Sequence, residues 1–159
     1  MSLRKALDFI QEIGTIMYVG GILSHIVIGV VLGHQDASTA YHVYVYKEIS
    51  AYYLILPGLA LKVACDLILY FALNVKTNWL RVKMLMMAFL TINAFVFLVP
   101  MMPELVELAH ESLPAGQVSQ AFLDLSNTEK LVGMSNVIPL LLEMIMGSFK
   151  PKLFAERRC

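Results

Sequence analysis

The sequence predicts an all-α, integral membrane four-helix bundle with a short amphipathic helical outer loop. Of its 159 residues, 58% are hydrophobic and 15% are charged, whereas soluble domains have about 45–50% apolar and about 25% charged residues. The apolar residues gather in four continuous blocks. A helix needs about 20 such residues to cross a hydrocarbon core of about 30 Å. Continuous blocks also lack the alternating pattern of a membrane β-barrel.

The four blocks predict one membrane domain over residues 1–159, with spans at about 10–32, 49–73, 82–102 and 129–148. The first block follows Arg4 and Lys5, as the apolar region of a signal peptide would. Its apolar run is longer than the usual 7–15 residues or so of such a region, which favours a retained helix.

Two segments outside the spans have patterns of their own. Residues 33–48 read as a polar outer loop that ends in tyrosines of an aromatic belt. "PELVELAHESL" and "VSQAFLDL", between residues 103 and 125, have apolar positions at helical spacing and predict a short amphipathic cap on the outer surface. The alternative is a solvated loop. "SNTE", from Ser126 to Glu129, matches a capping box directly before the fourth span.

The basic residues are sorted along the chain, and the net charge of zero gives no reason to expect nucleic acid as a partner. With four spans, the N-terminus, the middle loop and the C-terminus lie on one side of the bilayer. By the positive-inside rule this side is cytoplasmic, so we expect a multi-pass protein of the bacterial inner membrane with both termini in the cytoplasm. The basic residues of these three regions are Arg4, Lys5, Lys76, Arg81, Lys83, Lys150, Lys152, Arg157 and Arg158.

Two cysteines do not form a disulfide framework. Cys65 lies within the second predicted span, and Cys159 is the last residue and is expected to be a free cytoplasmic thiol. The sequence contains no nucleophile–base pair, phosphate-binding loop or metalloprotease motif.

The second span carries Lys62 and Asp66 in an otherwise apolar stretch, "GLALKVACDLIL". A charged residue at the centre of a spanning helix costs at least about 2.5–3.5 kcal/mol, so such residues persist where they are paired or line a cavity. Residues four positions apart share a helix face. The spacing therefore predicts that Asp66 neutralises Lys62.

Each of the other predicted spans also offers a polar group at middle or cytoplasmic depth: Glu12, Asn93 and Glu143. If all face inward, they form one cluster with a single lysine and up to three carboxylates. Such an excess of negative charge predicts that one carboxylate, Glu143 or Glu12, holds a proton or binds a cation. The functional interpretation is a proton relay or a ligand site, and the alternative is a structural network that fixes helix packing.

His25 lies in the outer half of the first span, where it could bind haem, copper or a quinone oxygen. The other histidines lie in outer segments, so a haem would need Met134 or Met101 as its second axial ligand. The alternative is a histidine hydrogen-bonded between helices. Copper is a weaker expectation. It rests on "PMMPE" near His110, because thioethers bind Cu(I).

Three short motifs carry a resemblance to known proteins: "GTIMYVGGILS", "WLRVKM" and "MGSFKP". By these the chain resembles a small uncharacterised bacterial family of four-helix membrane proteins. More distantly it is similar to copper-resistance D-like domains and to membrane-type protoporphyrinogen oxidase. The oxidase resemblance implies a lysine after the tryptophan, which Lys83 matches, and a histidine in the first helix, at the position of Gln11.

The leading functional hypothesis is a small membrane module that binds a hydrophobic or redox ligand, haem or quinone-like, within the bundle. A non-catalytic accessory subunit of a larger membrane complex is the first alternative. A proton- or cation-coupled carrier that works as a homo-oligomer is the second, because carriers with so few helices need a dimer.

Overall fold

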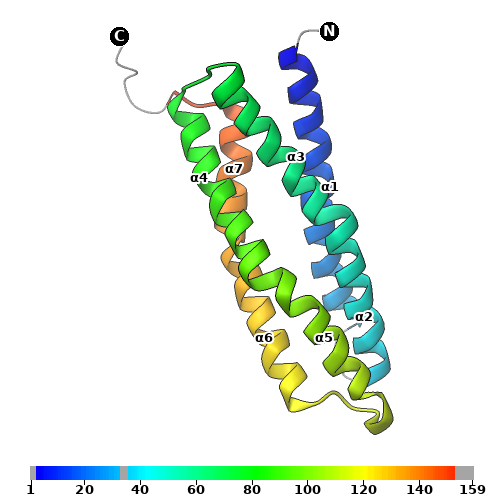
Figure 1. Ribbon diagram of the computed structural model, residues 1–159. Coiled ribbons are helices and arrows are strands. Elements are labelled where there is room, and N and C mark those ends of the chain that lie inside the picture. The colour runs from blue at the N-terminus through cyan, green and yellow to red at the C-terminus, as the bar shows by residue number, and fades with distance from the viewer. Residues whose placement is uncertain (1–2, 33–35, 153–159) are drawn as a thin grey trace.

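The computed structural model describes residues 3–32 and 36–152, and every element in these ranges is a helix. Four long helices run side by side (Figure 1). The first is α1 (Leu3–Leu32). The second joins α2 (Ala37–Ser50) and α3 (Leu56–Leu67), the third joins α4 (Asn78–Asn93) and α5 (Val99–Glu111), and the fourth joins α6 (Gln120–Ser135) and α7 (Val137–Phe149).

The structure confirms the predicted all-α fold, and all four helices are long and apolar enough to cross a membrane, as a multi-pass membrane protein requires. We call the end where α1 begins and α7 ends the terminal end, and the end where α5 and α6 meet the loop end. At the terminal end, Lys150 Nζ lies 3.7 Å from Asp8 Oδ1.

The helices are longer at the loop end than the sequence predicts. Residues 37–48 are not a loop, because α2 covers them and continues the second span. Asp36 caps this helix by accepting a hydrogen bond from the Thr39 amide at 2.8 Å. Hydrogen bonds from the Thr39 side chain and backbone also lower the pKa of the Asp36 carboxyl from its ordinary value.

The predicted cap is helical, but α5 and α6 extend the third and fourth spans and do not form a separate element. A short 3₁₀ turn, Leu113–Ala115, and Gly116 in a left-handed conformation (φ 71°) reverse the chain between them. The predicted capping box is wrong, since Ser126 lies inside α6. The residue that caps α6 is Ser119, which accepts from the Phe122 amide at 3.2 Å.

Two helices widen to π-helical turns, at Ala51–Ile55 and Ala94–Leu98. Each turn ends two residues before a proline, Pro57 or Pro100. Proline has no amide hydrogen and its ring displaces the carbonyl one turn earlier, which explains why the regular helical bonding fails there. A third π-helical turn, Ile68–Ala72, ends the second helix.

The bundle consists of two helix pairs, because α1 packs mainly on α3 and α4 packs mainly on α7 (Figure 1). At the loop end α2 packs on α5, and α6 joins them around an apolar core that includes Tyr44, Leu105 and Phe122. Midway along the bundle a second core holds Tyr18, Leu59 and Leu90.

Glycines allow α1 to approach the second helix closely. A Cβ added at Gly58 would lie 2.6 Å from the Tyr18 amide nitrogen and 2.8 Å from the Gly14 carbonyl oxygen. Both are backbone atoms and cannot rotate away. A Cβ on Gly21 would lie 2.6 Å from the Ile55 side chain.

Replacing Gly58 by alanine is therefore expected to lower the free energy of unfolding in detergent by about 1–3 kcal/mol, the usual cost of overpacking. Gly20→Ala is the matched control, since nothing lies within 4 Å of its added Cβ. Thermal unfolding followed by circular dichroism measures both. Equal melting temperatures for the two variants would contradict the close packing of α1 on α3.

Candidate functional site

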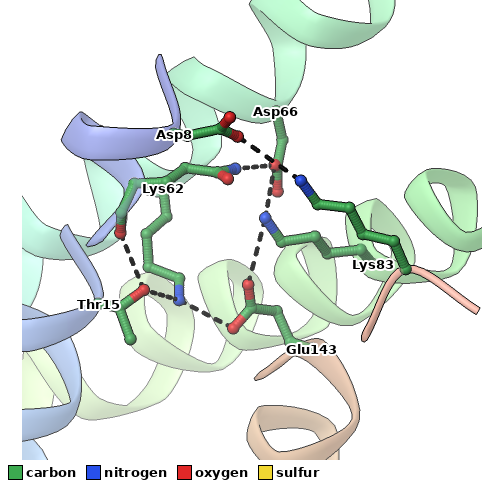
Figure 2. A network of polar contacts seen from close by, with 8 residues as sticks. Asp8, Thr15, Lys62, Asp66, Lys83 and Glu143 are labelled. Atoms are coloured by element: carbon green, nitrogen blue, oxygen red, sulfur yellow. Dashed lines mark hydrogen bonds and ion pairs between the residues drawn. The ribbon is translucent and has the colours of Figure 1, made fainter. Parts of the chain in front are cut away.

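A network of four buried charged side chains lies inside the bundle toward the terminal end (Figure 2). Lys62 of α3 contributes the first ammonium group. Its Nζ donates to Thr15 Oγ1 of α1 at 2.8 Å and lies 2.9 Å from Glu143 Oε2 of α7. The second contact is an ion pair whose angles depart from those of a hydrogen bond.

Lys83 of α4 contributes the second ammonium group. Its Nζ donates to Asp66 Oδ1 at 2.7 Å and lies 3.5 Å from Glu143 Oε1. The Gln11 side-chain amide of α1 also donates to Asp66 Oδ1. The two positions that the oxidase resemblance selects, Gln11 and Lys83, thus meet at one carboxylate oxygen.

The predicted pairing of Lys62 with Asp66 is wrong. Lys62 pairs across the bundle with Glu143, and Asp66 pairs with Lys83. The prediction of a single lysine is also wrong, because Lys83 does not lie in the loop but inside the network, where it is 2% exposed. Two ammonium groups face two carboxylates, so the charge argument for a protonated carboxylate no longer holds.

Two other residues expected in this cluster lie elsewhere. Glu12 is exposed on the surface of α1. Asn93 is buried farther from the terminal end, where its Nδ2 donates to Asn136 Oδ1 at 2.7 Å and to Ser135 Oγ at 3.1 Å. It links α4 to the junction of α6 and α7.

The network joins the two helix pairs. The Lys62–Glu143 contact connects α3 with α7, and the Lys83–Asp66 contact connects α4 with α3. Removing one partner from a buried ion pair leaves an uncompensated charge, which is the costly case in a low-dielectric interior. The network therefore fixes the depth of α7 relative to α3.

The candidate haem and copper ligands lie in different surroundings. His25 Nε2 lies 2.6 Å from Ser50 Oγ, so His25 is hydrogen-bonded between α1 and α2. Met134 is 69% exposed, and Met101 packs against the core at the loop end. His110 is exposed beside the Tyr41 ring. In residues 3–32 and 36–152, no three His, Cys, Asp or Glu side chains gather as a metal site would require.

A second buried ion pair lies near the loop end, and the sequence analysis missed it. Lys47 Nζ lies 3.2 Å from Glu129 Oε2, and Tyr44 donates to the same oxygen at 3.1 Å. The signal in the sequence is the spacing of Glu129, Asn136 and Glu143, seven residues apart on one helix face. All three are buried.

An apolar groove runs between α3 and the third helix on the outside of the bundle, with a volume of about 270 Å³. Its α3 wall is formed by Leu56, Leu59, Ala60, Val63, Ala64 and Leu67, and its other wall by Thr91 and Phe95. Asp66 lies three positions after Val63 and seven after Leu59, which places it on the same face of α3. Asp66 is 1% exposed, however, and neither it nor another side chain of the network is among the residues that line the groove.

Comparison of the chain with protein-family models, with curated proteins and with solved structures gives no match. The resemblance to copper-resistance D-like domains and to membrane-type protoporphyrinogen oxidase therefore stays a prediction.

The pairing predicts the result of double-mutant cycles. Lys62→Met and Glu143→Leu are each expected to lower the free energy of unfolding by about 3–5 kcal/mol, and the double variant should cost clearly less than their sum. Lys62→Met with Asp66→Leu should couple more weakly, because these side chains pair with different partners. Unfolding in mixed micelles measures the coupling energies. A stronger coupling of Lys62 to Asp66 than to Glu143 would show that the ion pairs are assigned wrongly.

Proposed function

We propose that this protein binds a hydrophobic, quinone-like ligand that enters from the bilayer. The observation that carries the proposal is the apolar groove between α3 and the third helix. Small-molecule sites combine mostly apolar walls with a few polar groups that orient the ligand. Here the groove would hold the apolar part of the ligand, and Thr91 is the polar residue of its lining.

The small residues of the groove support this proposal. Ala60 and Ala64 are exposed on α3 and leave the groove open between larger neighbours. Its volume of about 270 Å³ is close to the lower limit of about 300 Å³ for drug-sized ligands, which suits one ring or a short chain. A quinone-like ligand is favoured over haem, because the candidate axial ligands His25 and Met134 are not among the residues that line the groove.

The proposal includes a location. The positive-inside rule favours the bacterial inner membrane with the terminal end of the bundle in the cytoplasm. The basic residues of the described chain that support this orientation are Arg4, Lys5, Lys76, Arg81, Lys150 and Lys152. The network would then lie in the cytoplasmic half of the membrane, and the Lys47–Glu129 pair toward the outer surface.

Filling the groove tests the proposed ligand site. Ala60→Phe places a ring in the groove, and we expect it to remove at least about 90% of any co-purifying hydrophobic molecule, because occupied volume excludes the ligand. Ala88→Phe is the matched control, since Ala88 is exposed on α4 outside the groove lining. Organic extraction of protein purified in mild detergent, followed by mass spectrometry and an absorption spectrum, measures the bound molecules.

Two results would contradict the proposed function. One is the same set of extracted molecules from Ala60→Phe and Ala88→Phe. The other is a haem absorption band in the wild type that survives Ala60→Phe, because this would place the ligand outside the groove.

Thiol labelling in intact cells tests the orientation. Cys159 lies outside the described residues, and Cys65 is buried, so an impermeant maleimide added to whole cells should label the protein only after the membrane is opened. A Cys159→Ser variant is the control for labelling at Cys65. Labelling of Cys159 from outside intact cells would reverse the proposed orientation.

A further inference from the structure

We propose that the groove holds one acyl chain of an anionic phospholipid, whose phosphate lies at the terminal end of the groove against Arg81 and Lys76. This inference goes beyond the proposed function, because it assigns a lipid to this surface whether or not a quinone-like ligand also enters the groove. It also gives the groove a competitor, since an acyl chain and a quinone-like ligand would exclude each other from the same volume.

The groove has the length of an acyl chain in one leaflet. Its α3 wall runs along one helix face from Leu56 to Leu67, which is about 16 Å at a rise of about 1.5 Å per residue. The hydrocarbon core of a bilayer is about 30 Å thick, so the chains of one leaflet extend over about 15 Å. A volume of about 270 Å³ spread over this length is long and narrow. This shape fits one extended chain.

The lining offers no free donor to a polar head group. Its residues are aliphatic or aromatic apart from Thr91. The Thr91 hydroxyl donates to the Met87 carbonyl of its own helix at 2.7 Å, so its hydrogen is already used. A phosphate, which has only acceptors at neutral pH, would lose its hydrogen bonds with water inside the groove and gain none. The chain therefore belongs in the groove, and the head group belongs outside it.

Arg81 lies at the depth where the groove ends. The contact of Lys83 Nζ with Asp66 Oδ1 at 2.7 Å places these two residues at one depth. Leu67, the last groove residue of α3, is one residue nearer to the terminal end than Asp66. Arg81 is two residues nearer to it than Lys83. Arg81 is exposed and lies about four turns before Phe95 of the lining, so the two share a helix face.

The positive charge at this end of the groove is not compensated by the protein. Lys76 is exposed in the turn before α4, and the first turn of α4 contains no acidic residue. Among residues 3–32 and 36–152, no carboxylate lies within ion-pair distance of Lys76 or Arg81. At the loop end, in contrast, the third helix exposes Glu104 and Glu107. An anionic head group is therefore attracted at the terminal end and repelled at the loop end.

Lipids with the same chains and different head groups test the inference in the full-length protein. Dioleoyl phosphatidylglycerol and dioleoyl phosphatidylcholine would be titrated in detergent, and bound lipid would be measured by native mass spectrometry. A basic residue beside an anionic head group changes binding about five-fold, so two of them should make phosphatidylglycerol bind about 20–30-fold more tightly. Arg81→Gln should lower this preference about five-fold. Lys130→Gln is the matched control, since Lys130 is exposed on α6 away from the groove lining.

A second pair of variants tests the position of the chain. Ala60→Phe places a ring in the groove and should weaken the binding of both lipids at least about tenfold, because the ring occupies the volume of the chain. Ala121→Phe is the matched control, since Ala121 is exposed on α6 outside the groove lining. Free glycerol phosphate supplies the head group without a chain, and it should not displace phosphatidylglycerol at equal concentration.

Equal binding of the two lipids by the wild type would overturn the inference, and so would an equal loss of preference in Arg81→Gln and Lys130→Gln. Unchanged lipid binding in Ala60→Phe would show that the chain lies elsewhere. Displacement by glycerol phosphate would show a site for free phosphate instead of a lipid. The proposed function is decided separately, because a quinone-like ligand that binds the wild type and is lost in Ala60→Phe supports it with or without a lipid site. The comparison of the two lipids uses the wild type, so it holds even if a variant does not fold.

Discussion

The need to neutralise charge inside an apolar bundle determines much of this structure. Each ammonium or carboxylate group in the network must find an opposite charge within a few ångströms, because the hydrocarbon offers no water to replace it. Since these partners lie on different helices, the requirement sets the depth of α7 against α3 and of α4 against α3. The two helix pairs also share an apolar core, which contains Tyr18 of α1, Leu59 of α3 and Leu90 of α4. The charged network adds a polar connection between the pairs.

The same network makes the contact between the helices specific. Ion pairs and hydrogen bonds are directional, whereas apolar packing is not. The charged side chains therefore hold α3, which forms one wall of the groove, in a fixed position against α4 and α7. The Lys47–Glu129 pair at the loop end has no such groove among the pockets described and is satisfied by Tyr44 and its own partner. It therefore acts as a clamp between α2 and α6.

The sequence predicted the number of long apolar helices and three of the four charged residues of the network, but not their partners. Apolar blocks mark the segments that can face lipid, and Lys62, Asp66 and Glu143 are recognised because they interrupt these blocks. Spacing along one helix shows only which residues of that helix share a face. The partner of Lys62 depends on the register between α3 and α7, which no local pattern contains.

Two further predictions were wrong because the local sequence does not show which helices pack together. The segment from residue 37 to 48 is polar enough to resemble a loop, yet it is helical because α5 covers one of its faces. Lys83 follows Lys76, Thr77, Asn78 and Arg81 closely in the sequence, so the composition of its segment resembles that of a loop. Lys83 is buried because it contacts Asp66 of another helix, and the local sequence does not show this contact.

Two of the three π-helical turns lie at one level of the bundle, and this has a mechanical consequence. The π-helical turns Ala51–Ile55 and Ala94–Leu98 are centred thirteen residues from Asp66 and from Lys83, which contact each other. Gly21 of α1 packs on Ile55, and Asn93, directly before the second turn, bonds to Asn136 between α6 and α7. The backbone hydrogen bonding of the second and third helices is irregular at this level, so we expect the bundle to bend there first. The end of the groove nearer the loop end, at Leu56 and Phe95, lies in that cross-section, so a small tilt of one half of the bundle against the other would change the width of the groove.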